Sequence, residues 1–195
     1  MQNDPAKFEI LLEKIREIRT SEKMFYEKVK DVFAITSVDY EKGSEQAATF
    51  FSWVQNKFHY AITGETAAEI VVHRLSSKKE NAGLTSFKKE NPTVEEAKIA
   101  KNYLSQEELR GLINLSEQFL LYAESKALRK EKMYMEKWLT KVNQMIEMNE
   151  MDVLYHKGKI KAEDKDKYVQ QEMKKYREIQ QKLESKTTKS TKKLK

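Results

Sequence analysis

Apolar side chains recur along most of the chain with the spacing of amphipathic helices, and this pattern predicts an all-α fold. The first stretch follows Asp4 and Pro5, which suit an N-cap and the first helical position. Its apolar positions lie at i, i+3, i+4, i+7 and i+10: Phe8, Leu11, Leu12, Ile15 and Ile18. A second stripe follows with Tyr26, Val29, Val32 and Phe33. Segment 36–43 lacks this period and ends in Gly43, so we expect a loop there.

Capping residues mark the starts of the next helices. Ser44 suits the N-cap of a helix whose apolar side chains share one side: Ala47, Phe50, Phe51, Val54 and Phe58. Three later starts carry a capping box, in which a hydroxyl accepts from the third helical amide and a Glu carboxylate accepts from the cap's own amide. The three pairs are Thr66 with Glu69, Thr93 with Glu96, and Ser105 with Glu108. They predict helices over 67–75, 94–103 and 106–129, and apolar spacing predicts another over 133–150.

Two segments complete the pattern. The polar connection 76–92 is long for a compact domain, so it is either mobile or functional. A last helix is predicted over 161–184, with a narrow apolar seam close to a heptad repeat: Val169, Met173, Tyr176, Ile179 and Leu183. Such a narrow seam suits contact with one neighbouring helix, either in the same chain or in a second subunit. Between these alternatives, the sequence analysis favours a homodimer.

Composition supports one helical domain. Five Gly and two Pro in 195 residues are too few for a turn-rich β fold, and hydrophobic residues still make up 39%. We expect residues 1–184 to form a compact single-domain bundle of about seven or eight helices with a long final helix. The absence of Cys excludes disulfides and thiolate metal sites. No apolar run approaches the roughly 18 residues of a membrane span, and the start lacks a signal-peptide pattern. We therefore expect a cytoplasmic protein without membrane contact.

The net charge of +6 is concentrated at one end of the chain. Residues 1–156 hold 23 Lys and Arg against 25 Asp and Glu, whereas residues 157–195 hold 14 against 6. Residues 185–195 are expected to form a disordered tail, because they contain a single apolar side chain. Five lysines there are candidate contacts for non-specific DNA: Lys186, Lys189, Lys192, Lys193 and Lys195. The alternative is a solvated chain end without a binding role.

Several collinear segments between residues 7 and 160 carry a family resemblance: 15–29, 37–40, 51–60, 66–70, 83–88, 100–104 and 133–139. In these segments the chain resembles the RhuM family of bacterial virulence-associated proteins. The resemblance implies relatives with a further portion ahead of this one, similar to a helix-turn-helix DNA-binding module. We therefore expect this chain to correspond to the C-terminal domain of such a protein. The resemblance implies no biochemical activity.

Segment 56–70 gives the sharpest hypothesis about a site. It is predicted as a helix, a short glycine turn and a new helix, whose first amides can hold an anion. The candidate anion- or ligand-binding residues are Asn56, His59, Gly64, Glu65 and Thr66. His59 and Gly64 are faintly similar in spacing to a Fic/Doc motif, but Ala67 stands where that motif has a phosphate-binding Arg. The alternative interpretation is a packed helix–turn–helix with a partly buried His59.

These observations favour a non-catalytic accessory or oligomerisation domain of a RhuM-like protein, acting with a DNA-binding module. The alternative is a degenerate or divergent Fic/Doc-like nucleotide-transferring enzyme with a pocket around His59 and Gly64. His59 is the only candidate catalytic base, and no cofactor or metal site is predicted. Burial of His59 would weigh against the enzyme. An open cleft lined by His59, Glu65 and Thr66 would favour it.

Overall fold

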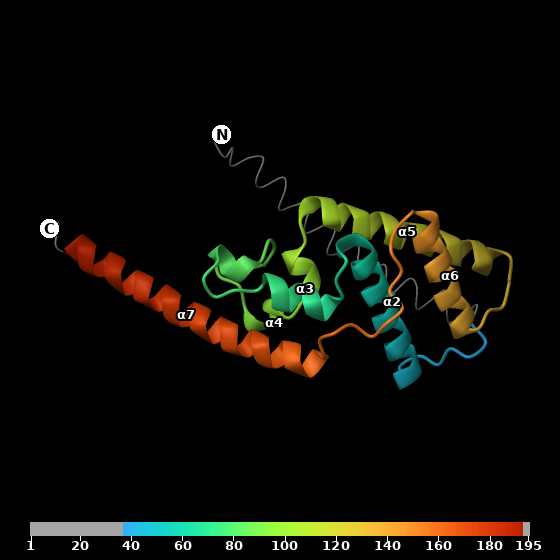
Figure 1. The fold of residues 1–195 in the computed structure, drawn as a ribbon, viewed down its shortest axis with the longest axis horizontal. Helices are drawn as coiled ribbons and strands as arrows, with labels where there is room; N and C mark the ends of the chain where they lie inside the picture. The colour runs from blue at the N-terminus through green and yellow to red at the C-terminus, as the bar shows by residue number, and fades with distance from the viewer. Residues whose placement is uncertain (1–36, 193–195) are drawn as a thin grey trace. The chain divides into compact units, whose positions relative to one another are not determined.

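Six α-helices and two short 3-10 helices form the part of the chain described by the structure, a computed structural model (Figure 1). It describes residues 37–192, except the side chains of residues 184 and 186–192. The helices are α2 (Glu45–Thr63), α3 (Ala67–Arg74), η1 (Glu80–Gly83), α4 (Val94–Ala97), η2 (Ala100–Tyr103), α5 (Gln106–Leu128), α6 (Met135–Met148) and α7 (Ala162–Lys192). No strand occurs between residues 37 and 192, so the all-α prediction is confirmed. The predicted apolar stripes Phe8–Ile18 and Tyr26–Phe33 lie outside the described residues.

The chain divides into two compact units. Unit 1 consists of Met1–Thr66 and Gln106–Lys157, and unit 2 consists of Ala67–Ser105 and Gly158–Lys195. Each unit therefore combines two stretches that are distant in the sequence. In the described residues, unit 1 contains α2, α5 and α6, and unit 2 contains α3, α4, α7 and both 3-10 helices.

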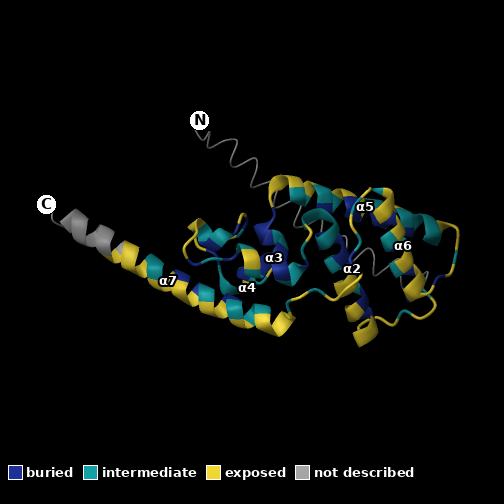
Figure 2. Cartoon of the chain, in the orientation of Figure 1, coloured by how far each residue is buried: buried dark blue, intermediate teal, exposed yellow. Residues whose placement is uncertain are grey.

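An aromatic core holds unit 1 together. The ring of Phe119 on α5 contacts the edges or faces of Phe58 on α2 and Trp138 on α6, with ring centroids 5.9 and 6.0 Å apart. All three side chains are fully buried. Figure 2 shows buried and exposed positions alternating along α2. The segment before α2 closes this core, because Trp138 Nε1 donates a hydrogen bond to Ser37 Oγ at 2.9 Å. Asp39 in the same segment accepts from the amide of Met135 at 2.9 Å and thereby caps the start of α6.

Unit 2 packs α7 against α3 and α4 through the predicted apolar seam. Val169, Met173 and Tyr176 are buried in it, and Ile70 and Val71 of α3 are fully buried in the same unit. The seam residues therefore serve the chain's own core, as one of the two sequence alternatives proposed. Beyond Tyr176 the seam opens, since Leu183 is 53% exposed.

The connection 76–92 is held in place within unit 2. The amide of Ser77 donates to Glu172 on α7, and Thr85 Oγ1 lies 2.9 Å from the carbonyl oxygen of Asn102. Leu84 is buried. The backbone turns through three successive left-handed residues, with φ of 49° at Asn81, 55° at Ala82 and 87° at Gly83. A side chain at Gly83 would clash with the carbonyl oxygen of Arg74, so this turn requires glycine there.

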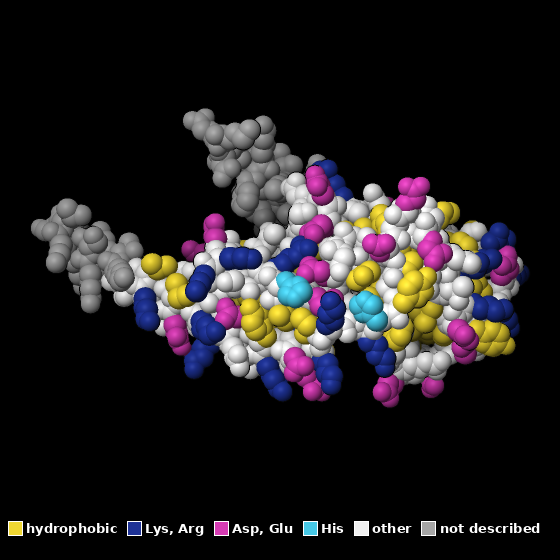
Figure 3. Space-filling view, viewed as in Figure 1, with side chains coloured by type: hydrophobic (Ala, Val, Ile, Leu, Met, Phe, Trp, Pro, Cys, Tyr) yellow, Lys and Arg dark blue, Asp and Glu magenta, His cyan; other side chains and the backbone are white. Residues whose placement is uncertain are grey.

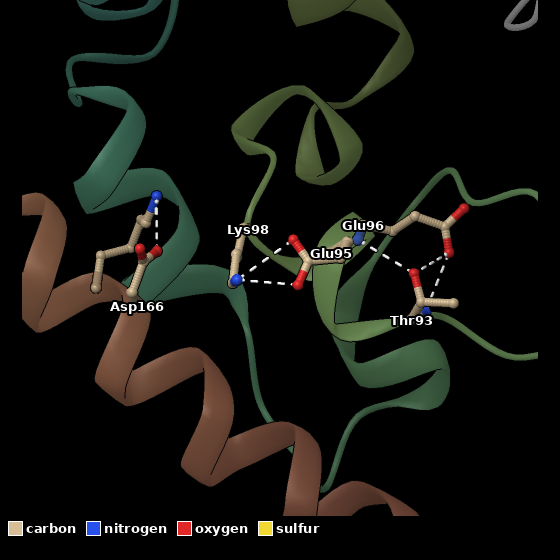
Figure 4. A network of polar contacts seen from close by, with 6 residues as sticks. Thr93, Glu95, Glu96, Lys98 and Asp166 are labelled. Carbon is tan, nitrogen blue, oxygen red and sulfur yellow. Dashed lines mark hydrogen bonds and ion pairs between the residues drawn. The ribbon is translucent and has the colours of Figure 1, made fainter.

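The predicted helix starts agree with the structure. Ser44 Oγ accepts from the amide of Ala47, and Thr93 with Glu96 forms a complete capping box (Figure 4). The same view shows the ion pair between Lys98 and Glu95, with 3.0 Å between Nζ and Oε1. Helices α3 and α5 begin directly after Thr66 and Ser105, two other predicted caps, and the predicted cap Asp4 lies outside the described residues.

Two boundaries differ from the sequence prediction. The helix predicted over 94–103 is wrong, because it splits into α4 and η2 with an extended residue, Ile99, between them. Asn102 Nδ2 donates to the carbonyl of Glu96, and the hydroxyl of Tyr103 donates to that of Ala97. These side chains take carbonyls that the next turn of an α-helix would use. In addition, α7 runs on to Lys192, past residue 185 where the tail was expected to begin. No Gly or Pro follows Leu183 to stop it.

Candidate functional site

The turn after α2 satisfies its own backbone amides. Gly64 ends α2 in the left-handed conformation, with φ of 72°, and its amide donates to the carbonyl of Tyr60 at 2.8 Å. The next amide, that of Glu65, donates to Thr63 Oγ1 at 3.1 Å. An anion at this turn would have to compete with both bonds. The amides of Gly64 and Glu65 are therefore already engaged within the turn.

The other candidate residues of this turn differ in burial. His59 lies on the buried side of α2 and is 1% exposed, and Thr66 is 2% exposed. Asn56 and Glu65 are half-buried, whereas Gly64 is exposed. The five residues are neighbours in the sequence, and the structure buries the side chain of His59, the candidate base. The burial of His59 is the arrangement that the packed helix–turn–helix interpretation expects.

Lys57, on α2 beside His59, is a buried charge that sequence reasoning missed. It is 4% exposed, and its Nζ donates to the carbonyl oxygen of Leu154 at 2.5 Å. The same Nζ lies 5.6 Å from the centre of the Tyr155 ring, a cation–π contact. Burial lowers the pKa of Lys57 below its usual range. Its partners come from a segment almost a hundred residues later in the chain, so no local pattern announces them.

The segment around Leu154 is fastened to unit 1 by two further contacts. The ring of His156 meets that of Tyr60 edge to face, with centroids 5.7 Å apart. The hydroxyl of Tyr155 donates to Glu147 Oε1 at 2.9 Å, and this bond raises the pKa of Tyr155. Lys57 and Tyr60 on α2 and Glu147 on α6 thus hold residues 154–156 in place. This gives the buried lysine a structural role.

Within residues 37–192, no group of three or more His, Asp or Glu side chains is placed to hold a metal ion. Among the described helices, none combines the length and apolar character that crossing a membrane requires.

The charged surface of unit 2 is the second candidate site. Unit 2 contains 20 Lys and Arg against 11 Asp and Glu, a net charge of +9, whereas unit 1 contains 17 against 20, a net charge of −3. Lys and Arg side chains recur along α7 (Figure 3). Of the predicted nucleic-acid residues, Lys186, Lys189 and Lys192 fall within α7, and Lys193 and Lys195 lie outside the described residues.

The family assignment is decided by a match over almost the whole chain. The model of the Virulence protein RhuM family matches residues 1–185. The chain belongs to the RhuM family. No curated protein and no solved structure matches it. Both units contribute to the RhuM match, which includes the turn after α2 and the seam of α7. The match ends at residue 185, so the last five lysines lie outside the part of the chain that matches the family.

Proposed function

We propose that this RhuM-family chain is a non-catalytic accessory domain that acts beside a DNA-binding module and adds non-specific contact with DNA. The observation that carries the proposal is the charge difference between the units, +9 in unit 2 against −3 in unit 1. Duplex DNA carries about one negative charge per 1.7 Å of its axis, so a basic surface gains affinity by releasing counterions.

Self-association belongs to the same proposal, but α7 offers little apolar surface for it. Of the seam residues, Val169, Met173 and Tyr176 are buried inside unit 2, whereas Leu183 is 53% exposed. Light scattering at tens of micromolar measures the mass. A dimer that reverts to a monomer in Leu183→Glu supports pairing through α7. A monomer mass for the unaltered chain removes oligomerisation from the proposal.

The alternative, a Fic/Doc-like nucleotide-transferring enzyme, is less well supported. Its only candidate base, His59, is buried, and the amides of Gly64 and Glu65 already have acceptors. Incubation with a labelled nucleotide tests this alternative directly. Label transferred to any protein, and lost in His59→Ala with the fold intact, would favour the enzyme over our proposal.

Binding of a short DNA duplex by the full chain tests the proposed DNA contact. We expect measurable affinity at low salt that falls steeply as salt rises, with a log–log slope near −0.9 for each phosphate contacted. A chain ending at Ser185 loses five lysines and one leucine, so its affinity and salt slope should both drop. Its melting temperature should hardly change, because little apolar surface is removed. No binding by the full chain at low salt would contradict the proposal.

A further inference from the structure

Unit 1 exposes three large apolar side chains around the segment that follows α6. Tyr155 is 73% exposed, Met148 is 76% exposed and Trp53 is 38% exposed. The hydroxyl of Tyr155 donates to Glu147, the residue before Met148. Lys57, one helical turn after Trp53, places its Nζ 5.6 Å from the centre of the Tyr155 ring. We call Trp53, Met148 and Tyr155 the unit 1 patch, and Figure 3 shows hydrophobic side chains gathered on this unit over α2 and α6.

The side chain of Tyr155 is exposed and yet fixed. Its hydroxyl bond to Glu147 Oε1 is 2.9 Å long, and its ring contacts Lys57, which donates to the carbonyl oxygen of Leu154. A side chain that is fixed before binding loses little conformational entropy when a partner covers it. Trp and Tyr dominate the binding energy of many protein interfaces, and Met is enriched in them. The composition and the fixed ring therefore both favour a protein partner.

Carboxylates surround the unit 1 patch on the elements that build it. Glu147, Glu150 and Asp152 are all exposed. Within the described residues, neither Glu150 nor Asp152 forms an ion pair. Residues 45–56 and residues 142–156, which contain the three patch residues, hold no Lys or Arg. The patch thus lies in two stretches of chain with acidic side chains and no basic ones.

Three lysines border these stretches. Lys57 is buried and bonded to Leu154, and Lys141 donates to Gln144 at 2.8 Å, two turns before the end of α6. Lys157 is exposed, so residues 142–157 hold three acidic residues against one lysine. An apolar surface with this excess of carboxylates repels nucleic acid and complements a partner that carries Lys and Arg.

The secondary structure of unit 1 limits how a partner can bind. No strand occurs in the described residues, so a partner has no strand edge to extend. An amphipathic helix binds differently, because it presents apolar side chains at i, i+3, i+4 and i+7 with charged side chains beside them. A helix with lysines on its polar flanks would cover the apolar side chains and neutralise the carboxylates.

From these observations we infer that the unit 1 patch is a docking surface for a basic amphipathic helix of another protein. The surface belongs to unit 1, whereas the proposed DNA contact belongs to unit 2. Each can therefore fail without the other.

Three fluorescent peptides of about 18 residues serve as probes, a length at which an isolated helix can form. The basic probe has leucines at helical spacing and lysines at the other positions. The acidic probe has glutamates in place of the lysines, and the scrambled probe has the composition of the basic one without an apolar face. Fluorescence anisotropy measures their binding to the full chain at about 50 mM and about 150 mM salt.

The patch variant is Trp53→Ala, Met148→Ala. Its matched control is Leu121→Ala, Leu128→Ala, which removes two exposed apolar side chains elsewhere in unit 1. Alanine is a strong helix former, so circular dichroism should show unchanged helix content in both variants.

We expect the basic probe to bind at least tenfold more tightly than the acidic and the scrambled probes. The patch variant should lose at least tenfold in affinity for the basic probe, and the control should lose less than about twofold. Equal binding of the acidic or the scrambled probe overturns the docking surface, as do equal losses in the two variants. Absence of binding by the basic probe also overturns it and leaves the proposed DNA contact standing.

Trp53 is partly buried, so a second variant changes exposed carboxylates only: Glu150→Gln, Asp152→Asn. This variant should bind the basic probe about threefold more weakly at about 50 mM salt. The difference should shrink at about 150 mM salt, because ions screen exposed charges. Unchanged affinity at the lower salt concentration would overturn the charge complementarity and with it the basic partner.

A second copy of the chain is the other candidate occupant of the patch, and light scattering at tens of micromolar decides between them. A monomer, or a dimer that persists in Trp53→Ala, Met148→Ala, supports docking of another protein. A dimer of the unaltered chain that becomes a monomer in this variant would show that a second copy covers the patch, and would overturn the inferred partner.

Discussion

The two units of this chain are both helical, yet they are stabilised differently. Unit 1 is built on interlocked aromatic rings from three long helices, with Phe119 between Phe58 and Trp138. Unit 2 combines the long helix α7 with short helices and a long connection. Hydrogen bonds between side chains and the backbone hold these parts in place, as those of Glu172 and Tyr103 do. The charges differ in the same way, −3 for unit 1 and +9 for unit 2.

The difference shows two ways of holding a helical unit together. A core of large rings gains stability from buried apolar area, which needs no charge on the surface. A unit tied by polar bonds contains less apolar surface to cover and can present many lysines to solvent. The proposed DNA contact belongs to unit 2, so the aromatic core of unit 1 can be altered with little direct effect on it.

The largest predicted loss of stability comes from removing the central aromatic ring of unit 1. Phe119→Ala deletes a fully buried ring between two others and should cost about 3–5 kcal/mol of unfolding free energy. Urea unfolding followed by tryptophan fluorescence measures it, because both tryptophans, Trp53 and Trp138, belong to unit 1. Leu121→Ala on the same helix is the control, since Leu121 is 65% exposed and should matter by less than about 0.5 kcal/mol. Equal losses in the two variants would contradict the aromatic core.

Two glycines in left-handed turns, one in each unit, allow the cost of adding a side chain to be compared between the units. Gly64 in unit 1 and Gly83 in unit 2 both have left-handed backbones, with φ of 72° and 87°. Nothing surrounds the Cβ position of Gly64, so Gly64→Ala should cost only the backbone strain, about 1–2 kcal/mol. Gly83→Ala adds a clash with the carbonyl of Arg74 and should cost about 3 kcal/mol. Urea unfolding followed by circular dichroism measures both, and a smaller loss for Gly83→Ala would show that the turn 81–83 yields easily.

The smallest predicted effect concerns the hydrogen bonds to Glu172 in unit 2, whose contribution to stability depends on pH. Lys175 Nζ, at 2.7 Å, and the amide of Ser77, at 2.9 Å, both donate to Glu172 and lower its pKa to about 2. Because the pKa is lower in the folded state, the stabilisation is complete above about pH 4.5 and is lost as the pH falls towards 2.

Glu172→Gln should therefore cost about 1–2 kcal/mol at pH 7 and nothing near pH 2. Thermal unfolding of the variant and the unaltered chain between pH 2 and pH 7 measures the difference. Glu178→Gln, at an exposed position one turn and a half further along α7, is the control. A difference between variant and unaltered chain that does not shrink towards pH 2 would contradict this role of Glu172.

Features that depend on neighbouring residues were predictable from the sequence. The starts of α3 and α5 follow Thr66 and Ser105, and the capping box at Thr93 is present, because a cap and its helix lie within four residues. The seam of α7 was predicted as an apolar face for the same reason. Its partner could not be predicted from periodicity alone, since α3 and a second subunit offer the same kind of surface.

Features that depend on distant residues were not predictable. At the break after Ala97, the carbonyl of that residue accepts a hydrogen bond from the hydroxyl of Tyr103, six residues later. Lys57 is buried because Leu154 supplies an acceptor from the far end of unit 1. In the candidate site, the glycine turn was predicted correctly at Gly64. The use of Thr63 Oγ1 by the amide of Glu65 is a matter of side-chain geometry that spacing does not reveal.

The interleaved order of the two units determines when each of them can close during synthesis. Unit 1 needs α6, which ends at Met148, and unit 2 needs the α7 residues as far as Tyr176. Helices α3 and η2 are complete once Tyr103 has been made, so they wait for some seventy residues, or roughly 4 to 15 seconds at about 5–20 residues per second. During that interval Ile70 and Val71 lack the helix that covers them. A nascent chain halted between α6 and α7 would contain a closed unit 1 and an open unit 2, and chaperones would meet the apolar face of α3 first.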